Sequence, residues 1–145
     1  MDSLKKVIGV FLILVAAAVA LHTVLEPLYY TSTDEQPYNN QVWLYLNILS
    51  AISVVLGIII SYVRKSNVNE SSSVQEYIAA NTLFFGFMFA AIFFFWNWFG
   101  LINPGGDFTP TKSDTGAMVW IIFDAILPLL NGALGMYLLR SNSSD

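Results

Sequence analysis

Four long apolar segments constrain this chain more than any other feature of its sequence. They cover residues 7–25, 42–63, 77–99 and 117–139, and each has roughly the 20 residues that a helix needs to cross about 30 Å of hydrocarbon. The segments are continuously apolar, whereas the strands of a membrane barrel alternate in polarity over about ten residues. We therefore expect an all-α integral membrane protein with one membrane domain over residues 1–145, in which four transmembrane helices form a compact bundle.

The composition narrows the chemistry that such a bundle can perform. Hydrophobic residues make up 56% of the chain, and with only six Lys and Arg and a net charge of -4 it lacks the basic surface that nucleic-acid binding needs. Cysteine is absent and His22 is the only histidine, so thiolate chemistry is excluded and a three-histidine metal site cannot be built from this chain. We expect no catalytic residue, no metal site and no cofactor bound by this chain alone.

The distribution of Lys and Arg predicts the orientation in the membrane. Short loops that carry an excess of Lys and Arg stay on the cytoplasmic side. Five basic residues fall on one side of a four-span topology, and only Lys112 falls on the other. All four tryptophans lie near the opposite helix ends, as expected for rings at the membrane interface. We expect a multi-pass protein of the cell (cytoplasmic) membrane with both termini in the cytoplasm; the five basic residues are Lys5, Lys6, Arg64, Lys65 and Arg140.

Local signals predict where several helices end. Pro27 follows the first apolar segment and is expected to end its helix, because proline lacks the amide hydrogen that continues a helix. Asn39 and Asn40 are candidate N-caps for the second helix, and residues 73–76, Ser-Val-Gln-Glu, have the spacing of a capping box. The first segment also permits a second interpretation. Lys5-Lys6, an apolar run and then residues 18–20, Ala-Val-Ala, fit a cleavable signal peptide as well as a retained anchor.

The third segment predicts which of its faces contacts other helices. Membrane helices associate through small and polar residues, since lipid is as apolar as leucine. At 100° per residue one stripe of this segment is small or polar, and all its phenylalanines except Phe93 flank or oppose that stripe. We expect the stripe to face the bundle; its members are Ala79, Thr82, Gly86, Ala90 and Asn97.

Asp124 is the most informative single residue. It lies about seven residues, or roughly 10 Å, from the end of its helix, where a carboxylate costs about 2 to 3 kcal/mol on insertion scales and normally faces protein or water. Pro128 adds a second polar group, because its ring leaves the carbonyl of Asp124 without a helical partner. His22, Asn47 and Asn97 lie at a comparable depth, and Asn131 lies in the inner half of the same helix as Asp124.

Two interpretations of these polar residues stay open. They could form a site for a cation, a proton or a small polar solute, or a neutral Asp124 could hydrogen-bond to an asparagine and hold helices together. His22 and Glu26 share a helix face at a spacing of four and could provide part of a metal site, or form an interfacial hydrogen bond. The candidate packing or polar-site residues are Asp124, Pro128, Asn131, Asn97, Asn47 and His22.

One family resembles this chain. The fourth segment reads MVWIIFDAILPLLNGALGMYLLRS, and the loops of this four-span chain are acidic and rich in Asn and Ser. In these respects it resembles, over most of its length, the small accessory subunit encoded beside the archaeal ammonia monooxygenase subunits, often called subunit X. The resemblance implies a structural, non-catalytic role beside a copper-dependent monooxygenase, with copper and the oxidation of ammonia in partner subunits. No copper ligand can be carried over to this chain.

Two functional hypotheses follow. The first is a non-catalytic integral membrane subunit that scaffolds or stabilises a larger hetero-oligomeric membrane enzyme, with other integral membrane subunits and lipids as partners. The second is a small oligomeric channel or transporter that uses Asp124 within the membrane. An enzyme by itself is the weakest class, because the sequence has no phosphate-binding loop, zinc-protease helix motif or nucleophile elbow.

Overall fold

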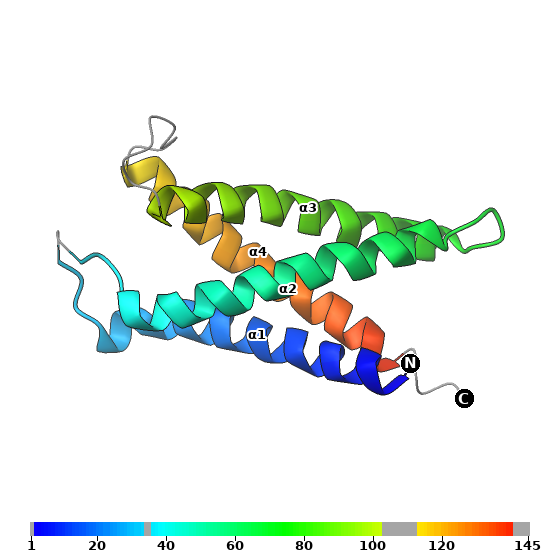
Figure 1. Ribbon diagram of the computed structural model, residues 1–145, viewed down its shortest axis with the longest axis horizontal. Coiled ribbons are helices and arrows are strands. Elements are labelled where there is room, and N and C mark those ends of the chain that lie inside the picture. The colour runs from blue at the N-terminus through cyan, green and yellow to red at the C-terminus, as the bar shows by residue number, and fades with distance from the viewer. Residues whose placement is uncertain (1, 34–35, 103–112, 141–145) are drawn as a thin grey trace.

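Four long helices make up the described part of the chain. The computed structural model describes residues 2–33, 36–102 and 113–140, and within these ranges it contains no strand (Figure 1). Every predicted apolar segment lies inside one helix, and all four helices are long and apolar enough to cross a membrane. A helix of 28 residues is about 42 Å long, which matches the hydrocarbon core together with its interfaces. The helices are α1 (Asp2–Tyr29), α2 (Asn40–Ser66), α3 (Val74–Ile102) and α4 (Ser113–Arg140).

The helices run alternately up and down in one bundle. The most extensive contacts join α1 to α4 and α2 to α3, and α4 also packs against α3. Figure 1 shows that α4 crosses the other helices obliquely, close to α3 at one end and close to α1 at the other. The start of α1, the turn between α2 and α3 and the end of α4 share one end of the bundle, which we call the basic end. We call the opposite end, where α1 leads into α2, the tryptophan end.

The interior is packed by residues at spacings of three and four. In α3 these are Ala80, Leu83, Phe87, Ala90, Phe94 and Asn97, all buried. The predicted face was right at Ala90 and Asn97 and wrong at Thr82, which is exposed, and at Phe87 and Phe94, which are buried. The Phe87 ring fits inside because Gly57 of α2 presents no side chain to it, and the Phe94 ring stacks on Phe123 of α4.

Glycine brings α1 and α4 together near the basic end. A Cβ atom on Gly135 would lie 2.8 Å from the carbonyl oxygen of Gly9 and 2.8 Å from Cγ1 of Ile13. The two backbones are therefore in direct contact, as is common where membrane helices pack closely. This contact holds the second half of α4 against α1 and away from α3.

Two predicted helix ends are observed and one was wrong. Asn39 caps α2, accepting a hydrogen bond from the Val42 amide at 3.4 Å, and Ser73 caps α3, accepting one from the Glu76 amide at 3.1 Å. Pro27 does not end the first helix, which continues to Tyr29. Because Pro27 lies in the last turn, the helix loses one amide donor there and the Tyr30 amide still bonds to the Glu26 carbonyl at 2.9 Å.

Candidate functional site

Glu26 is the centre of a polar site at the tryptophan end. Its side chain leaves the last turn of α1 toward the start of α2. Oε1 accepts a hydrogen bond from the Asn39 amide at 2.7 Å, and Oε2 accepts one from the indole Nε1 of Trp43 at 3.1 Å. The two N–H groups satisfy the charged carboxylate of Glu26 in place of water. Because both donors belong to the start of α2, these bonds fasten α1 to α2.

His22 lies one turn before Glu26 and is buried. Its Nδ1 atom is hydrogen-bonded to the Tyr29 hydroxyl at 2.5 Å, and the centroids of the His22 and Trp43 rings are 4.8 Å apart. Nε2 is 3.8 Å from Oε1 of Glu26 and makes no hydrogen bond within the described part of the chain. The predicted pairing of His22 with Glu26 is thus present as a contact, while the imidazole is positioned mainly by Tyr29 and Trp43.

Asp124 belongs to the same region. The residue is only 8% exposed, and among the described residues no group forms a hydrogen bond with its buried Oδ1 atom. Its neighbour Phe123 packs in the same core cluster as Val19 of α1, which lies one turn before His22. The hydroxyl of Thr23 on α1 is also buried and unpaired within the described ranges. We call His22, Thr23, Glu26 and Asp124 the outer polar cluster.

The remaining predicted site residues do not extend this cluster. Asn97 donates to the Phe93 carbonyl of its own helix at 2.8 Å, and Asn47 is half-buried. Pro128 is half-buried inside α4, one turn after Asp124. Asn131 is completely buried and donates to the Ser53 hydroxyl of α2 at 3.0 Å. The helix-packing interpretation therefore describes Asn131, and the open question concerns Asp124 and its neighbours on α1.

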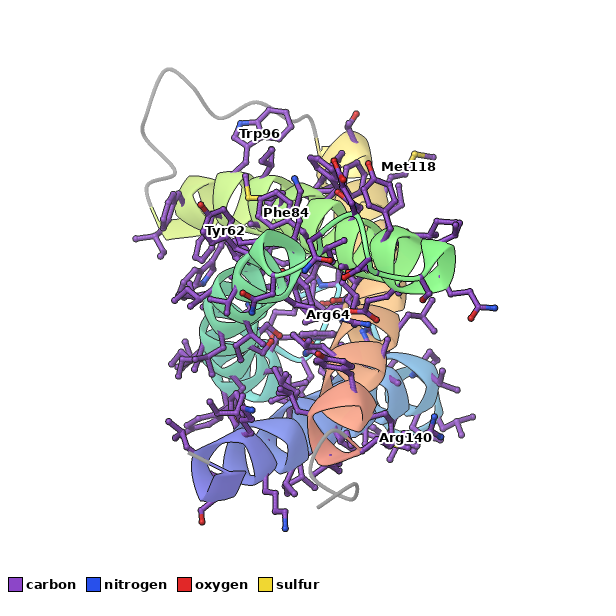
Figure 2. All side chains as sticks on the ribbon, turned by 90° about the vertical axis from the view of Figure 1, so that its right-hand side faces the viewer. Tyr62, Arg64, Phe84, Trp96, Met118 and Arg140 are labelled. Atoms are coloured by element: carbon purple, nitrogen blue, oxygen red, sulfur yellow. The ribbon has the colours of Figure 1, made fainter. Side chains whose placement is uncertain are left out.

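A second polar site, at the basic end, was not predicted. The guanidinium of Arg64 donates from Nε and Nη2 to the two carboxylate oxygens of Glu76, at 2.7 and 2.6 Å. The same group lies 3.7 Å from the centre of the Tyr137 ring on α4. Figure 2 looks at the basic end and shows Arg64 between α2, α3 and α4. We call Arg64, Glu76 and Tyr137 the basic-end clamp; in the sequence, its arginine and carboxylate are twelve residues apart across a turn.

The described residues limit what either site can hold. In residues 2–33, 36–102 and 113–140 no three His, Cys, Asp or Glu side chains are grouped so that they could bind a metal ion. The outer polar cluster instead offers a buried carboxyl oxygen, an imidazole nitrogen and a hydroxyl, which are groups that can bind a proton, a water molecule or a single cation. The basic-end clamp holds three helices together by charge, hydrogen bonding and a cation–π contact.

Comparison with known proteins adds no relative. No protein-family model, no curated protein and no solved structure matches the chain.

Proposed function

We propose that this protein is a non-catalytic integral membrane subunit that scaffolds a larger hetero-oligomeric membrane enzyme. The observation that carries the proposal is a ridge of large side chains on the outside of α3. Its members are between 44% and 63% exposed and lie at spacings of four and three, so they share one helix face. We call it the α3 ridge; it consists of Phe85, Phe89, Ile92, Trp96 and Phe99.

The α3 ridge is suited to contact with a helix of another subunit. Exposed apolar surface faces lipid without cost, so a membrane helix gains affinity for a partner through close packing and not through hydrophobicity. Rigid aromatic rings supply large contact areas with few rotatable bonds. Neighbouring rings stiffen the ridge further: the Phe89 and Phe93 centroids are 4.4 Å apart, and those of Phe95 and Phe99 are 5.5 Å apart.

The internal polar groups support the same proposal. Glu26 fastens α1 to α2, Asn131 bonds to Ser53 across the interior, and Arg64 ties α2 to α3 and α4. These polar side chains hold the helices in a fixed arrangement, which a scaffold needs. The resemblance of residues 118–141 to subunit X supports a more specific proposal, in which the partner is a copper-dependent ammonia monooxygenase whose copper is held by other subunits.

Purification from native membranes tests the scaffold proposal. The tagged chain, extracted in mild detergent, should elute with larger membrane subunits that mass spectrometry identifies. Replacing Phe85, Phe89 and Trp96 together by leucine keeps the surface apolar but removes the rings, and should reduce the recovered partners at least ten-fold. Tyr45→Leu is the matched control, because Tyr45 is an exposed aromatic residue on α2, and it should retain them. Recovery of the unmodified chain as a lone species would refute the proposal.

The outer polar cluster favours a second candidate function, a small channel or transporter. Oδ1 of Asp124 and Nε2 of His22 are buried and have no hydrogen-bond partner among the described residues, and ionisable groups within membrane segments mark ion or proton pathways. The purified protein in liposomes should then conduct protons or a monovalent cation, and Asp124→Asn should abolish the flux. Glu70→Gln, in the exposed turn between α2 and α3, is the control. Equal flux with and without the Asp124 carboxylate would remove this residue from any transport mechanism.

A further inference from the structure

An opening between α3 and α4 lies toward the basic end. Near the tryptophan end these helices touch, and the Phe94 and Phe123 rings are stacked with centroids 4.7 Å apart. Toward the basic end they diverge, because α4 turns away to pack on α1 (Figure 1). The resulting α3–α4 groove has walls that are mainly apolar or small; they include Ile78, Ala79, Thr82, Leu129, Ala133 and Met136.

The groove has the depth of one membrane leaflet. It ends near the middle of the bundle, where α3 and α4 meet so closely that a Cβ atom on Gly86 would lie 2.7 Å from Cδ2 of Leu130. Leu129 and Arg140 both line it and are eleven residues apart, which corresponds to about 16 Å along α4. This is about half of the 30 Å hydrocarbon thickness. A groove of that length fits an acyl chain from one leaflet and is too short for a transmembrane helix of a partner.

The mouth of the groove is polar and carries positive charge. Arg64, Gln75 and Arg140 line it, and no acidic residue is among the described residues that do so. Arg64 binds Glu76 through Nε and Nη2, which leaves the Nη1 amino group outside those two bonds. Arg140 is exposed on the last turn of α4, as Figure 2 shows in the view of the basic end. Because Glu76 neutralises Arg64, the positive charge that remains at the mouth is that of Arg140, and one phosphate would complement it.

We propose that the α3–α4 groove is a binding site for one anionic phospholipid of the leaflet at the basic end. The acyl chain lies along the apolar walls between α3 and α4, and the phosphate lies at the mouth beside Arg140. Charge selects the headgroup, because a basic residue near the membrane surface favours an anionic over a zwitterionic lipid. Lipid in the groove fills the space between α3 and α4 that no described side chain occupies, and it requires no partner subunit.

A photoactivatable lipid tests the proposal. The purified chain is reconstituted into vesicles of phosphatidylcholine containing a trace of phosphatidylglycerol with a photoreactive acyl chain, and the labelled peptides are mapped. Labelling should concentrate on residues 78–83 and 129–137. Phosphatidylcholine with the same photoreactive chain should label these segments about five-fold less, and unlabelled phosphatidylglycerol should compete. Arg140→Gln should weaken labelling by phosphatidylglycerol about five-fold, the effect of about one basic residue at the surface.

Two further variants separate the groove from general lipid contact. Ala133→Phe fills the groove with a side chain at an exposed position, so the fold is retained and labelling should be lost. Ala17→Phe, at an exposed position on α1, and Lys6→Gln, at the basic end of α1, are the matched controls and should label like the unmodified chain. Uniform labelling of all four helices, equal labelling by the two headgroups, or covalent capture of a second copy of the chain at the groove would each overturn the proposal.

Discussion

Adding one methyl group at Gly57 should destabilise the contact between α2 and α3. The nearest atoms to a Cβ at this position are Cε1, Cδ1 and Cζ of the Phe87 ring, and the overlap is too close for any real pair of carbon atoms. Phe87 is completely buried and packs with Leu12, Leu83 and Leu134. The ring therefore has no free space to enter, and Gly57→Ala must displace either the ring or the helix.

The expected cost follows from this geometry. Overpacking of a well-filled interior costs about 1–3 kcal/mol, while alanine in place of glycine in a helix contributes up to about 1 kcal/mol in the opposite direction. Gly57→Ala should therefore lower the free energy of unfolding by about 1–2 kcal/mol. In a Phe87→Leu background the ring is gone and only the helix propensity remains, so Gly57→Ala should be neutral or stabilising. The coupling between the two substitutions should be about 2 kcal/mol.

Reversible unfolding in mixed micelles of mild detergent and dodecyl sulfate, followed by tryptophan fluorescence, measures these energies. Gly132→Ala is the control, because a Cβ on Gly132 of α4 meets no atom within 4 Å, and it should be neutral or slightly stabilising. A steric clash with Phe87 is refuted if Gly57→Ala is as mild as Gly132→Ala, or if its cost is unchanged when Phe87 is leucine.

Three further substitutions test the polar contacts between helices, each by the same unfolding measurement. Glu26→Ala leaves the Trp43 indole without its acceptor and should cost about 1–3 kcal/mol with a red shift of the Trp43 emission; unchanged emission would contradict the hydrogen bond. Arg64→Lys keeps the charge but loses the two-pronged geometry, so a cost of about 1 kcal/mol is expected, and a Lys variant as stable as the parent would show that the geometry is unimportant. Asn131→Ala removes the bond to Ser53 and should cost at least about 0.6 kcal/mol of stability, the average for such bonds in membranes. Ser53→Ala, which removes the other partner of this bond, is the comparison. No loss of stability in the Asn131→Ala variant would mean that the bond is not formed.

The lengths and number of the helices could be predicted because they depend on local composition. A continuous apolar run of about 20 residues has to satisfy its own backbone hydrogen bonds in lipid, and only a helix does so. The caps at Asn39 and Ser73 were predictable for the same local reason. At Pro27 the local rule was wrong, because a proline in the last turn removes only one donor and the next amide still closes the turn.

The candidate sites were only partly predictable. Asp124 and His22 were identified because a titratable group inside an apolar segment is costly and therefore conspicuous. Thr23 was missed because a lone threonine in a helix carries no such signal. Arg64 was used only to predict orientation, since nothing in the sequence shows that its guanidinium turns back into the bundle toward Glu76 and Tyr137.

The sequence by itself determined that this chain forms four membrane-spanning helices, because hydrophobicity and helix length act along the chain. Only the tertiary structure decided which faces meet. The crossing angle of α4 brings it against α3 at the tryptophan end and against α1 at the basic end. That one angle buries Phe94 against Phe123 and opens the α3–α4 groove. Lipid is as apolar as the side chains, so no hydrophobic pattern in the sequence specifies such an angle, and interhelical packing sets it.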